Sequence, residues 1–511
     1  MINVLLIGLG PHARRIQLPI LLKDGKTYSA SVKAIIDLAS QEQIIKTYLK
    51  DKNVDSSTEL TFLSAKLAQL KQGELSGELA DHLDSLVERH DINAVFICTE
   101  PVYHTPYAKW ALRKSLHVFM DKPISAPLHL ATSSKAVSQI TRDYLELAQL
   151  YRKQRQAHPG LVFELMAQRR YHPAFHEMDR LIREVKERTG VPITSFQSTH
   201  CDGQWRMPDE IVDQDYHPYN QGYGKCLHSG YHSIDITNWL VRRSYGETHT
   251  LKDIEVFANF VYPNDFIAQL PLDTYHQLFN DFARYRKYPP EVLAEKYDSF
   301  GEIDTQITTA YKDGKGRTLT VGQLGLLHTG FGQRDWPTAE GRDLYKGNGR
   351  VRHEAHYLVQ GPFQTIYFQS LQSEEILNEQ VNHSNVGGEY HLDIHVFRNS
   401  KMFPEWKAYE KINLNDLSIN ILEGYSRGHQ EDARRSAVLT FLKSIQDPTI
   451  VRYSDLLDQD FSVGLIGAAY RSALHRKQNL NPLVQVSDEL NQSLRETTSQ
   501  AKTKESVYAI S

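Results

Sequence analysis

The sequence has few cysteines, and their scarcity excludes two kinds of site. Three occur in 511 residues, Cys98, Cys201 and Cys226, and no two of them form a C-x-x-C pair. Neither a disulfide framework nor a thiolate zinc site is therefore expected. A reducing cytoplasm is the compartment that we expect for such a chain, so the localisation is predicted as cytoplasmic.

The chain also lacks a charge excess and a long hydrophobic run. Its 58 lysines and arginines nearly balance 62 aspartates and glutamates, which leaves a formal net charge of −4. No basic surface for nucleic acid is expected from that balance. No apolar stretch reaches the roughly 18 residues of a membrane helix, so no membrane contact is expected. The apolar run at residues 2–7 ends in glycines, which favours a core strand over a signal peptide.

What the sequence does have is a short apolar run followed by a glycine pattern. Residues 2–7 predict a strand buried on both faces, and G-x-G-x-x-A follows at residues 8–13. The first glycine permits a tight turn, the second lets a pyrophosphate approach the backbone, and the small third residue lets a helix pack closely. An ordinary strand-to-helix turn is the alternative. The pattern predicts a dinucleotide-binding loop that includes Gly8, Gly10, Pro11, His12 and Ala13.

An aspartate stands where a dinucleotide site needs one. A second apolar run, residues 32–36, ends at Asp37, 27 residues after Gly10. An acidic residue at about this interval binds the hydroxyls of the adenosine ribose. Residues 38–40 are Leu, Ala and Ser, and none of them is a cation for a 2′-phosphate. NAD is therefore predicted as the cofactor, with NADP less favoured; a surface aspartate that caps the next helix is the alternative.

Further strands alternate with helical patterns up to about residue 128. Apolar runs at 60–63, 93–99 and 116–120 predict βαβ units and a doubly wound parallel sheet, an α/β Rossmann domain over residues 1–128. Ligands bind beyond the carboxyl ends of such strands. A lysine between a carboxylate and a proline at a strand end is unusual, although a surface turn is the alternative. The residues predicted on the cofactor side are Thr99, Glu100, Pro101, His104, Asp121 and Lys122.

Several ordered motifs together resemble the Gfo/Idh/MocA family of oxidoreductases. They are GLGPHA at 8–13, Asp37, AVFICTEPVYH at 94–104, HVFMDKP at 117–123, AQRRYHPAF at 167–175 and GKCLHSGYHSID at 224–235, and residues 462–478 are similar to the family's final helix. The resemblance implies an NAD(P)-binding Rossmann domain and a C-terminal α/β domain, residues 129–485, with a large open, mostly antiparallel sheet. That sheet commonly serves assembly, which implies a homo-oligomer (dimer or tetramer). The final helix, 461–477, would pack back near the first domain, and a polar tail would occupy 486–511.

The resemblance also has departures. The family's usual E-K-P is D-K-P here, with Asp121 in place of glutamate, and His228 stands where the family usually has an aspartate. If residues 227–240 form a helix, His228, His232 and Asp235 share one face. Gly230 within that helix would suit the close approach of a ligand.

Two alternatives remain for this histidine pair. Histidines at i and i+4 with Asp235 could bind zinc, but the H-E-x-x-H glutamate is absent and no metal is predicted. Hydrogen-bonded core histidines are the other alternative. The H-E-x-H sequence at 353–356 has the wrong spacing for zinc and is interpreted as structural.

The rest of the second half predicts a sheet with inserted segments. Strand patterns begin near residue 256, and loop-like insertions are predicted at 271–302 and 337–351. Trp205 and Arg206 could bind a sugar face and an anionic group, although surface positions are an equally good interpretation. The predicted substrate-binding residues are Lys122, Arg170, Trp205, Arg206, His228 and His232.

These observations predict an NAD-dependent oxidoreductase that acts on a carbohydrate or cyclitol, the small-molecule partner implied by the resemblance. His232 would take the hydroxyl proton while a hydride passes to nicotinamide. Lys122 would orient the substrate and stabilise the developing oxyanion, and Asp235 or His228 would hold the tautomer of His232. Two alternatives stay open: redox-neutral use of bound NAD for sugar hydrolysis, elimination or epimerisation, and a non-catalytic NAD-binding sensor.

Overall fold

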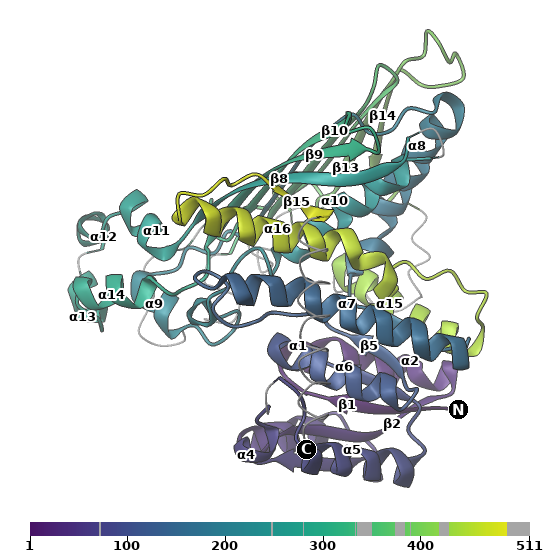
Figure 1. Cartoon of the computed structure of the whole chain (residues 1–511), viewed down its shortest axis with the longest axis vertical. Coiled ribbons are helices and arrows are strands. Elements are labelled where there is room, and N and C mark those ends of the chain that lie inside the picture. The colour runs from purple at the N-terminus through teal and green to yellow at the C-terminus, as the bar shows by residue number, and fades with distance from the viewer. Residues whose placement is uncertain are drawn as a thin grey trace, which may run out of the picture. The chain divides into compact units, whose positions relative to one another are not determined.

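The computed structural model describes residues 1–70, 73–246, 249–279, 281–332, 334, 350–373, 384–388, 390–417 and 429–487. The chain divides into two compact units, each built from separate stretches (Figure 1). Unit 1 comprises Met1–Ala126, Arg142–His172 and Gly424–Asp460, and unit 2 comprises Pro127–Thr141, Pro173–Glu423 and Phe461–Ser511. The predicted polar tail from residue 488 and most of the predicted insertion at 337–351 lie outside the described residues.

Unit 1 contains a six-stranded parallel sheet in the order β3-β2-β1-β4-β5-β6. This confirms the predicted doubly wound sheet, and the strand order reverses between β1 and β4, where α/β sheets bind ligands. Nearly all-apolar runs form the central strands because both faces are covered. The strands are β1 (Ile2–Ile7), β2 (Ala30–Leu38), β3 (Glu59–Leu63), β4 (Ala94–Ile97), β5 (His117–Met120) and β6 (Phe163–Leu165). The helices are α1 (Pro11–Arg15), α2 (Gln17–Asp24), α3 (Glu42–Asp51), α4 (Ala65–Ala68), α5 (Gly77–His90), α6 (His104–Arg113) and the larger part of α7 (Ser134–Ala157).

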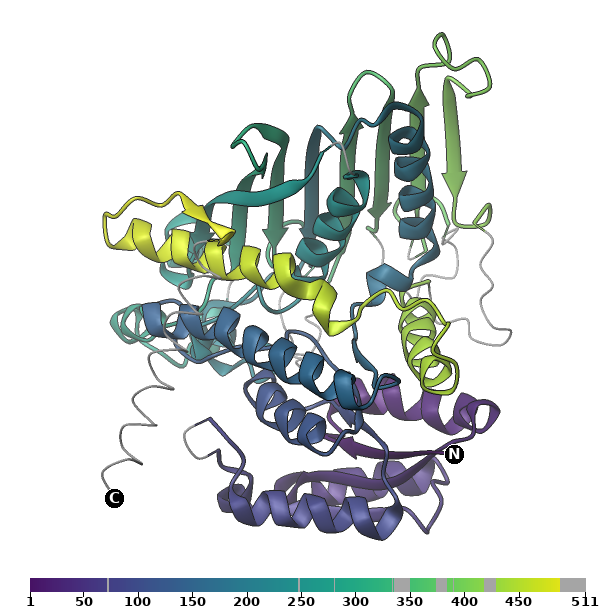
Figure 2. The ribbon, with the colours of Figure 1, turned by 45° about the vertical axis from the view of Figure 1, so that its right-hand side comes forward.

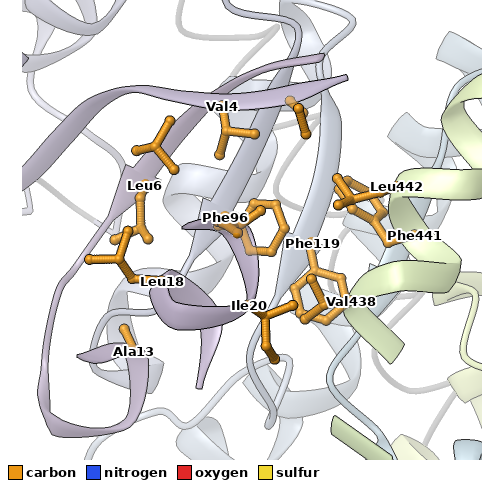
Figure 3. Close-up of a cluster of buried hydrophobic side chains, with 14 of the residues drawn as sticks. Val4, Leu6, Ala13, Leu18, Ile20, Phe96, Phe119, Val438, Phe441 and Leu442 are labelled. Carbon is orange, nitrogen blue, oxygen red and sulfur yellow. The ribbon is translucent and has the colours of Figure 1, made fainter. Parts of the chain in front are cut away.

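A helix from far along the chain completes the core of unit 1. The ring of Phe441 on α15 (His429–Gln446) lies 5.5 Å from that of Phe96 and 5.3 Å from that of Phe119, between centroids (Figure 3). The guanidinium of Arg435 donates to both carboxylate oxygens of Asp24, at 2.8 and 2.6 Å. The sequence pattern placed one domain boundary near residue 128, whereas unit 1 also takes in 142–172 and 424–460. The predicted final helix, α16 (Asp460–Lys477), lies in unit 2 from Phe461 onward.

Unit 2 contains a nine-stranded sheet in the order β14-β13-β12-β11-β7-β10-β9-β8-β15. Its strand pairs are mostly antiparallel, with β7 and β10 parallel, which confirms the predicted second sheet. Helices α8 (Pro173–Thr189) and α10 (Gly230–Ser244) pack on each other, and α10 packs on β7 and β10 (Figure 2). The strands are β7 (Ser195–Cys201), β8 (Leu251–Val261), β9 (Asp304–Asp313), β10 (Thr318–Leu327), β11 (His353–Gln360), β12 (Gln364–Leu371), β13 (Asp393–Arg398), β14 (Tyr409–Asn413) and β15 (Val484–Gln485).

The predicted insertion at 271–302 is helical rather than loop-like. Its buried aromatic rings form a small core: Tyr275 stacks on Phe282, with centroids 5.2 Å apart, and Tyr297 is 1% exposed. These rings give the short helices an apolar side that composition alone did not indicate. The helices of the insertion are α12 (Leu272–Leu278), α13 (Phe282–Tyr285) and α14 (Pro290–Tyr297), and two further short helices, α9 (Pro208–Asp213) and α11 (Pro263–Gln269), precede it. Among the described residues, no helix combines the length and the hydropathy that crossing a bilayer demands.

Candidate functional site

The glycine loop of unit 1 has the geometry of an anion cradle. Gly8 has φ +88°, and a Cβ added there would lie 2.8 Å from the carbonyl oxygen of Cys98. Only glycine fits that turn, because the loop lies against the residue that follows β4. A Cβ added at Gly10 would meet nothing within 4 Å. The loop is thus closed against the sheet at its first glycine and open at its second, as a bound pyrophosphate requires.

Asp37 lies at the end of β2 and is tied to this loop. Its Oδ2 accepts a hydrogen bond from the backbone N–H of Leu9 at 2.6 Å, and its Oδ1 accepts one from Leu38 at 2.6 Å. The carboxylate is therefore held beside the loop while its side chain stays partly exposed. This is where a carboxylate that binds the ribose hydroxyls has to stand, so loop and aspartate together fit a dinucleotide.

The helix after the loop is short. α1 ends at Arg15 after five residues, Pro11 occupies its first position, and Ala13 is buried. Ile16 separates it from α2. Because proline has no N–H, the first turn of this helix offers an anion one backbone donor fewer than it would with another residue at its first position.

Asp121 and Lys122 follow β5 on the same edge of the sheet. Gln17 donates from Nε2 to Oδ1 of Asp121 at 3.1 Å, and Nε2 of His12 lies 4.0 Å from the same oxygen. Burial raises the pKa of Asp121 to about 7, although Lys122 and Arg434 oppose the shift. Asp121, which replaces the glutamate of the E-K-P motif in the family that the sequence resembles, is therefore an acid that titrates near neutrality.

His104 has a positioning role that differs from the predicted cofactor contact. Its ring is fully buried, with Nδ1 2.7 Å from the carbonyl oxygen of Pro123 and Nε2 3.0 Å from that of Thr99. Burial lowers the pKa of His104 to about 4. A neutral ring has one N–H and donates to one of these two carbonyl oxygens, and His104 packs between the turn after β4 and the turn that carries Lys122. Of the other residues predicted there, Thr99 is partly exposed, Glu100 is exposed, and Pro101 begins a short 3-10 helix.

Arg170 also differs from its predicted substrate-binding role. It is 2% exposed in unit 1, and its guanidinium donates to the carbonyl oxygens of Tyr453, at 3.0 Å, and Asp458, at 3.4 Å. Arg170 therefore holds the 453–458 segment of unit 1, an internal role that its motif did not indicate.

In unit 2, the predicted helix begins later than the sequence indicated. α10 starts at Gly230, so His228 precedes it, while His232 and Asp235 lie within it. A Cβ added at Gly230 would lie 2.5 Å from the carbonyl oxygen of Lys225. The group that comes close to Gly230 is therefore the backbone of Lys225, whereas the sequence predicted a ligand there. Oδ1 of Asp235 accepts a hydrogen bond from Ser462 at 3.1 Å.

His228 lies within a shell of aromatic and imidazole rings. Its ring stacks on that of His217, with centroids 4.5 Å apart and planes at 16°. Tyr223 meets it edge-on at 5.3 Å, and the rings of Tyr219 and His328 lie 6.1 and 6.5 Å away. Sequence reasoning singled out none of these four neighbours, which come from two stretches, residues 217–223 and His328, about 100 residues apart.

A buried ion pair supports this shell. Nζ of Lys225 donates to Oδ2 of Asp202 at 2.6 Å and to the Ser229 hydroxyl at 2.9 Å, and Nδ1 of His200 lies 2.9 Å from it. Burial alone would raise the pKa of Asp202, but Lys225 and Arg350, whose NH2 lies 2.7 Å from Oδ1, hold it well below its usual range. Ser229 is the residue before α10, so the pair fixes the start of the helix that carries His232.

His328 connects this ion pair to the ring shell. Its Nδ1 is hydrogen-bonded to the hydroxyl of Tyr219, and its Nε2 lies 3.9 Å from Oδ2 of Asp202. Burial lowers the pKa of His328 to about 3, with Asp202 opposing, and burial raises the pKa of Tyr219 well above its usual range. A neutral His328 and a protonated Tyr219 follow, so Tyr219 donates to Nδ1 and the N–H of His328 lies at Nε2, toward Asp202.

Trp205 and Arg206 are less exposed than the surface interpretation requires. Nε1 of Trp205 donates to the hydroxyl of Tyr275 at 3.2 Å, and its ring packs against Phe279 at 5.7 Å. Arg206 is 3% exposed and donates to Gln204 at 3.2 Å. Trp205 therefore belongs to the aromatic core of the insertion, while the charge of Arg206 lies near His328, whose pKa it helps to lower.

The H-E-x-H sequence on β11 has internal partners. Nδ1 of His356 lies 3.0 Å from the Ser198 hydroxyl, and Nε2 lies 3.1 Å from Oε1 of Glu354. Within the part of the chain that the structure describes, no group of three or more His, Cys, Asp or Glu side chains is arranged to hold a metal ion.

Glu302 holds the segment that leads into His228, and we expect it to make the stability of unit 2 depend on pH. Its Oε1 accepts hydrogen bonds from the N–H of Cys226 and the hydroxyl of Tyr470, both at 2.8 Å. Burial raises its pKa from 4.5 to about 7. The folded pKa exceeds the unfolded one, so the stabilising contribution is complete below pH 4.5 and is lost as pH rises through 7.

We therefore expect Glu302→Gln, which resembles the protonated acid, to gain stability over the wild type between pH 5 and pH 7. The gain should grow by up to about 1.4 kcal/mol per pH unit and level off above pH 7. Urea unfolding at pH 5, 6, 7 and 8 measures it. A gain that is equal at all four pH values would contradict the assignment.

The comparisons with known proteins agree with this geometry. Residues 2–143 match the profile of an oxidoreductase family described as having an NAD-binding Rossmann fold, Gfo/Idh/MocA. No curated protein sequence matches the chain.

Several solved structures resemble the whole chain. An oxidoreductase from Agrobacterium radiobacter, in complex with NAD+, L-tartaric acid and magnesium, is 12% identical to this chain. The alignment covers 95% of this chain and 99% of that protein, with a TM-score of 0.56. A levoglucosan dehydrogenase in complex with NADH and levoglucosan is 14% identical, with coverages of 95% and 99% and a TM-score of 0.54. A scyllo-inositol dehydrogenase from Lactobacillus casei is 17% identical, with coverages of 95% and 98% and a TM-score of 0.50. At these identities the likeness establishes the fold.

Proposed function

We propose that this protein transfers a hydride between a carbohydrate or cyclitol carbon and NAD, since residues 2–143 match the profile of the Gfo/Idh/MocA oxidoreductase family. The observation that carries the proposal is the loop at Gly8 and Gly10 with the Asp37 carboxylate held beside it by the Leu9 N–H. Asp37 and the uncharged Leu38, Ala39 and Ser40 favour NAD over NADP. Two proteins of the same fold are a levoglucosan dehydrogenase and a scyllo-inositol dehydrogenase, and their names support a sugar or cyclitol substrate for this chain.

The bound NAD would supply the hydride acceptor, and the chain's own residues would manage the proton and the charge. Gly8–Ala13 would hold the pyrophosphate and Asp37 the adenosine ribose. Lys122 would orient the reacting hydroxyl and stabilise the oxygen as negative charge develops. His232 would take the hydroxyl proton, since the ordinary pKa of histidine, about 6.5, suits a base near neutrality.

The groups behind His232 would hold it in place. Ser229, tied to the Lys225–Asp202 pair, fixes the start of α10, and Asp235 is anchored by Ser462. Either Asp235 or His228 would hold the tautomer of His232. Two ordered imidazoles at the start of α10, in place of the family's usual carboxylate and imidazole, change the charge around the site.

That change favours a second candidate, redox-neutral chemistry on tightly held NAD. A transient oxidation of the sugar would activate it for hydrolysis, elimination or epimerisation, and NADH would be reoxidised in the same cycle. The observation behind it is His228, which lies against His217 and near a neutral His328 instead of presenting a carboxylate. The two candidates differ in whether NADH accumulates.

Mass spectrometry of the purified protein, followed by a substrate panel, tests the proposal. Retained or added NAD should bind, and a sugar or cyclitol should produce NADH absorbance at 340 nm. A new sugar product without NADH would favour the redox-neutral candidate. Binding without any product would favour an NAD-binding sensor. A protein that binds no dinucleotide would overturn the proposal, and a clear preference for NADP would overturn the role given to Asp37.

We also propose that the open face of the second sheet pairs copies of this chain. Side chains on that face are exposed and largely aromatic: Tyr357 lies opposite Tyr367 across β11 and β12, and Phe397 lies opposite Tyr409 across β13 and β14. Their exposed fractions, between 37% and 50%, are high for such large rings. A contiguous apolar patch of this kind is typical of an interface.

We expect Tyr367→Lys to shift the protein from a dimer or tetramer toward the monomer. A charge in the middle of the aromatic row would remain buried in the interface without a partner. Light scattering coupled to size exclusion measures the mass, and Val451→Lys, an exposed apolar residue of unit 1, is the control. A wild-type monomer at micromolar concentration would contradict the proposal.

A further inference from the structure

The last stretch of unit 1 brings an arginine to the dinucleotide loop. Arg434, near the start of α15, has its NH1 3.3 Å from Oε1 of Glu431. The same carboxylate oxygen lies 3.7 Å from NH2 of Arg15, the last residue of α1. Glu431 thus links the helix that follows the loop to the helix that carries Arg434. The Arg434 side chain is 14% exposed, so it is largely enclosed in unit 1.

Two groups of the loop edge are sensitive to the charge of Arg434. Burial lowers the pKa of His12 well below its ordinary value, and Arg434, Arg15 and Lys122 lower it further. Burial raises the pKa of Asp121, and Lys122 and Arg434 counteract that shift. Since His12 belongs to the loop and Asp121 follows β5, the charge of Arg434 acts on both the loop and the carboxyl end of β5.

The local charge balance suits a dianion. Three cations, Arg15, Lys122 and Arg434, act electrostatically on His12, and a neutral His12 adds no charge. Glu431 contributes one negative charge, and Asp121, with a pKa near 7, contributes part of another. The diphosphate of a dinucleotide carries two negative charges. A guanidinium is the side chain best shaped to bind phosphate oxygens, because its planar donors form two parallel hydrogen bonds.

We propose that Arg434 binds the diphosphate of the dinucleotide, so that the cofactor site of unit 1 includes a residue from the C-terminal part of the chain. Its enclosed position, linked through Glu431 to Arg15 at the end of the helix that follows the loop, supports this role. The inference rests on the proposed function, because it requires that a dinucleotide binds.

The test compares ligands that carry the diphosphate with one that does not. NADH and ADP-ribose are titrated into the wild type, Arg434→Ala and Arg434→Lys by calorimetry, with adenosine as a competitor without phosphate. A charge-assisted hydrogen bond to a phosphate contributes enough that Arg434→Ala should weaken NADH and ADP-ribose about 10- to 100-fold. Adenosine should bind the variant as it binds the wild type, and Arg434→Lys should recover part of the affinity.

Lys443→Ala is the matched control. Lys443 is a cation on the same helix whose ammonium lies 5.6 Å from the ring centroid of Tyr28, away from the loop. We expect it to bind all three ligands normally. Equal NADH affinity in Arg434→Ala and the wild type would overturn the proposal, as would an equal loss of adenosine binding, which would indicate a general disturbance. A wild type that binds neither NADH nor ADP-ribose would instead overturn the proposed function.

Discussion

Replacing Lys122 with alanine is expected to cut turnover by about 10²- to 10³-fold while NADH binding weakens by only a few fold. The size follows from the removal of one positioned donor from a developing oxyanion. Binding is expected to survive because the loop at Gly8 and Gly10 and the carboxylate of Asp37 do not depend on this side chain. Steady-state rates on the substrate found by the panel, together with NADH titration, measure the two effects.

Two further variants make the result specific. Lys122→Arg keeps the charge but changes the shape, and it should recover only part of the rate. Lys114→Ala removes a lysine before the amino end of β5, away from Lys122 after its carboxyl end, that is paired with Asp84 at 2.5 Å and 39% exposed, and turnover should not change. Unchanged turnover in Lys122→Ala would remove Lys122 from the mechanism. A loss of NADH binding as large as the loss of rate would make it a binding residue instead.

Replacing Lys225 with alanine is expected to destabilise unit 2 by about 3–5 kcal/mol, because it leaves the buried Asp202 carboxylate without its closest cation. Lys225 and Asp202 are 0% and 1% exposed, so water cannot replace the missing charge. Part of the cost is offset by Arg350, which also contacts Asp202. Urea unfolding followed by tryptophan fluorescence should show an earlier transition for Lys225→Ala than for the wild type.

The double variant Lys225→Met with Asp202→Asn separates pairing from burial. Since both charges are then absent, it should unfold at a higher urea concentration than Lys225→Ala. NADH binding should not change in either variant at low urea, because Lys225 lies in unit 2 and the loop lies in unit 1. A loss of less than 1 kcal/mol in Lys225→Ala would show that the ion pair contributes little.

The parts of the site that depend on local pattern were predictable. Gly8, Gly10 and Asp37 follow apolar strands directly, and the geometry of a strand-to-helix turn determines what residues of those types can do there. The strands of the first sheet were predictable for the same reason, since a parallel sheet buried on both faces requires uninterrupted apolar runs.

The parts that depend on distant contacts were not predictable. His228 was assigned to a helix because its spacing from His232 suits one, but the carbonyl of Lys225 closes on Gly230 and the helix starts after it. His104 and Arg170 have the chemistry of ligand-binding residues, yet their side-chain nitrogens contact backbone carbonyl oxygens of the chain itself. Asp202 and His328 stand more than 100 residues apart in the sequence, and no local period connects them.

The arrangement of unit 1 has a consequence for synthesis of the chain. Phe96 and Phe119 are made early, but Phe441, which packs on both rings, follows only after residues 173–423 of unit 2 have been translated. At roughly 5–20 residues per second, that delay is on the order of tens of seconds. Throughout it, the nascent unit 1 exposes an apolar face that α15 will later cover. Unit 1 can therefore complete its fold only after α15 has been translated, and a fragment that stops at residue 172 would expose the same face permanently.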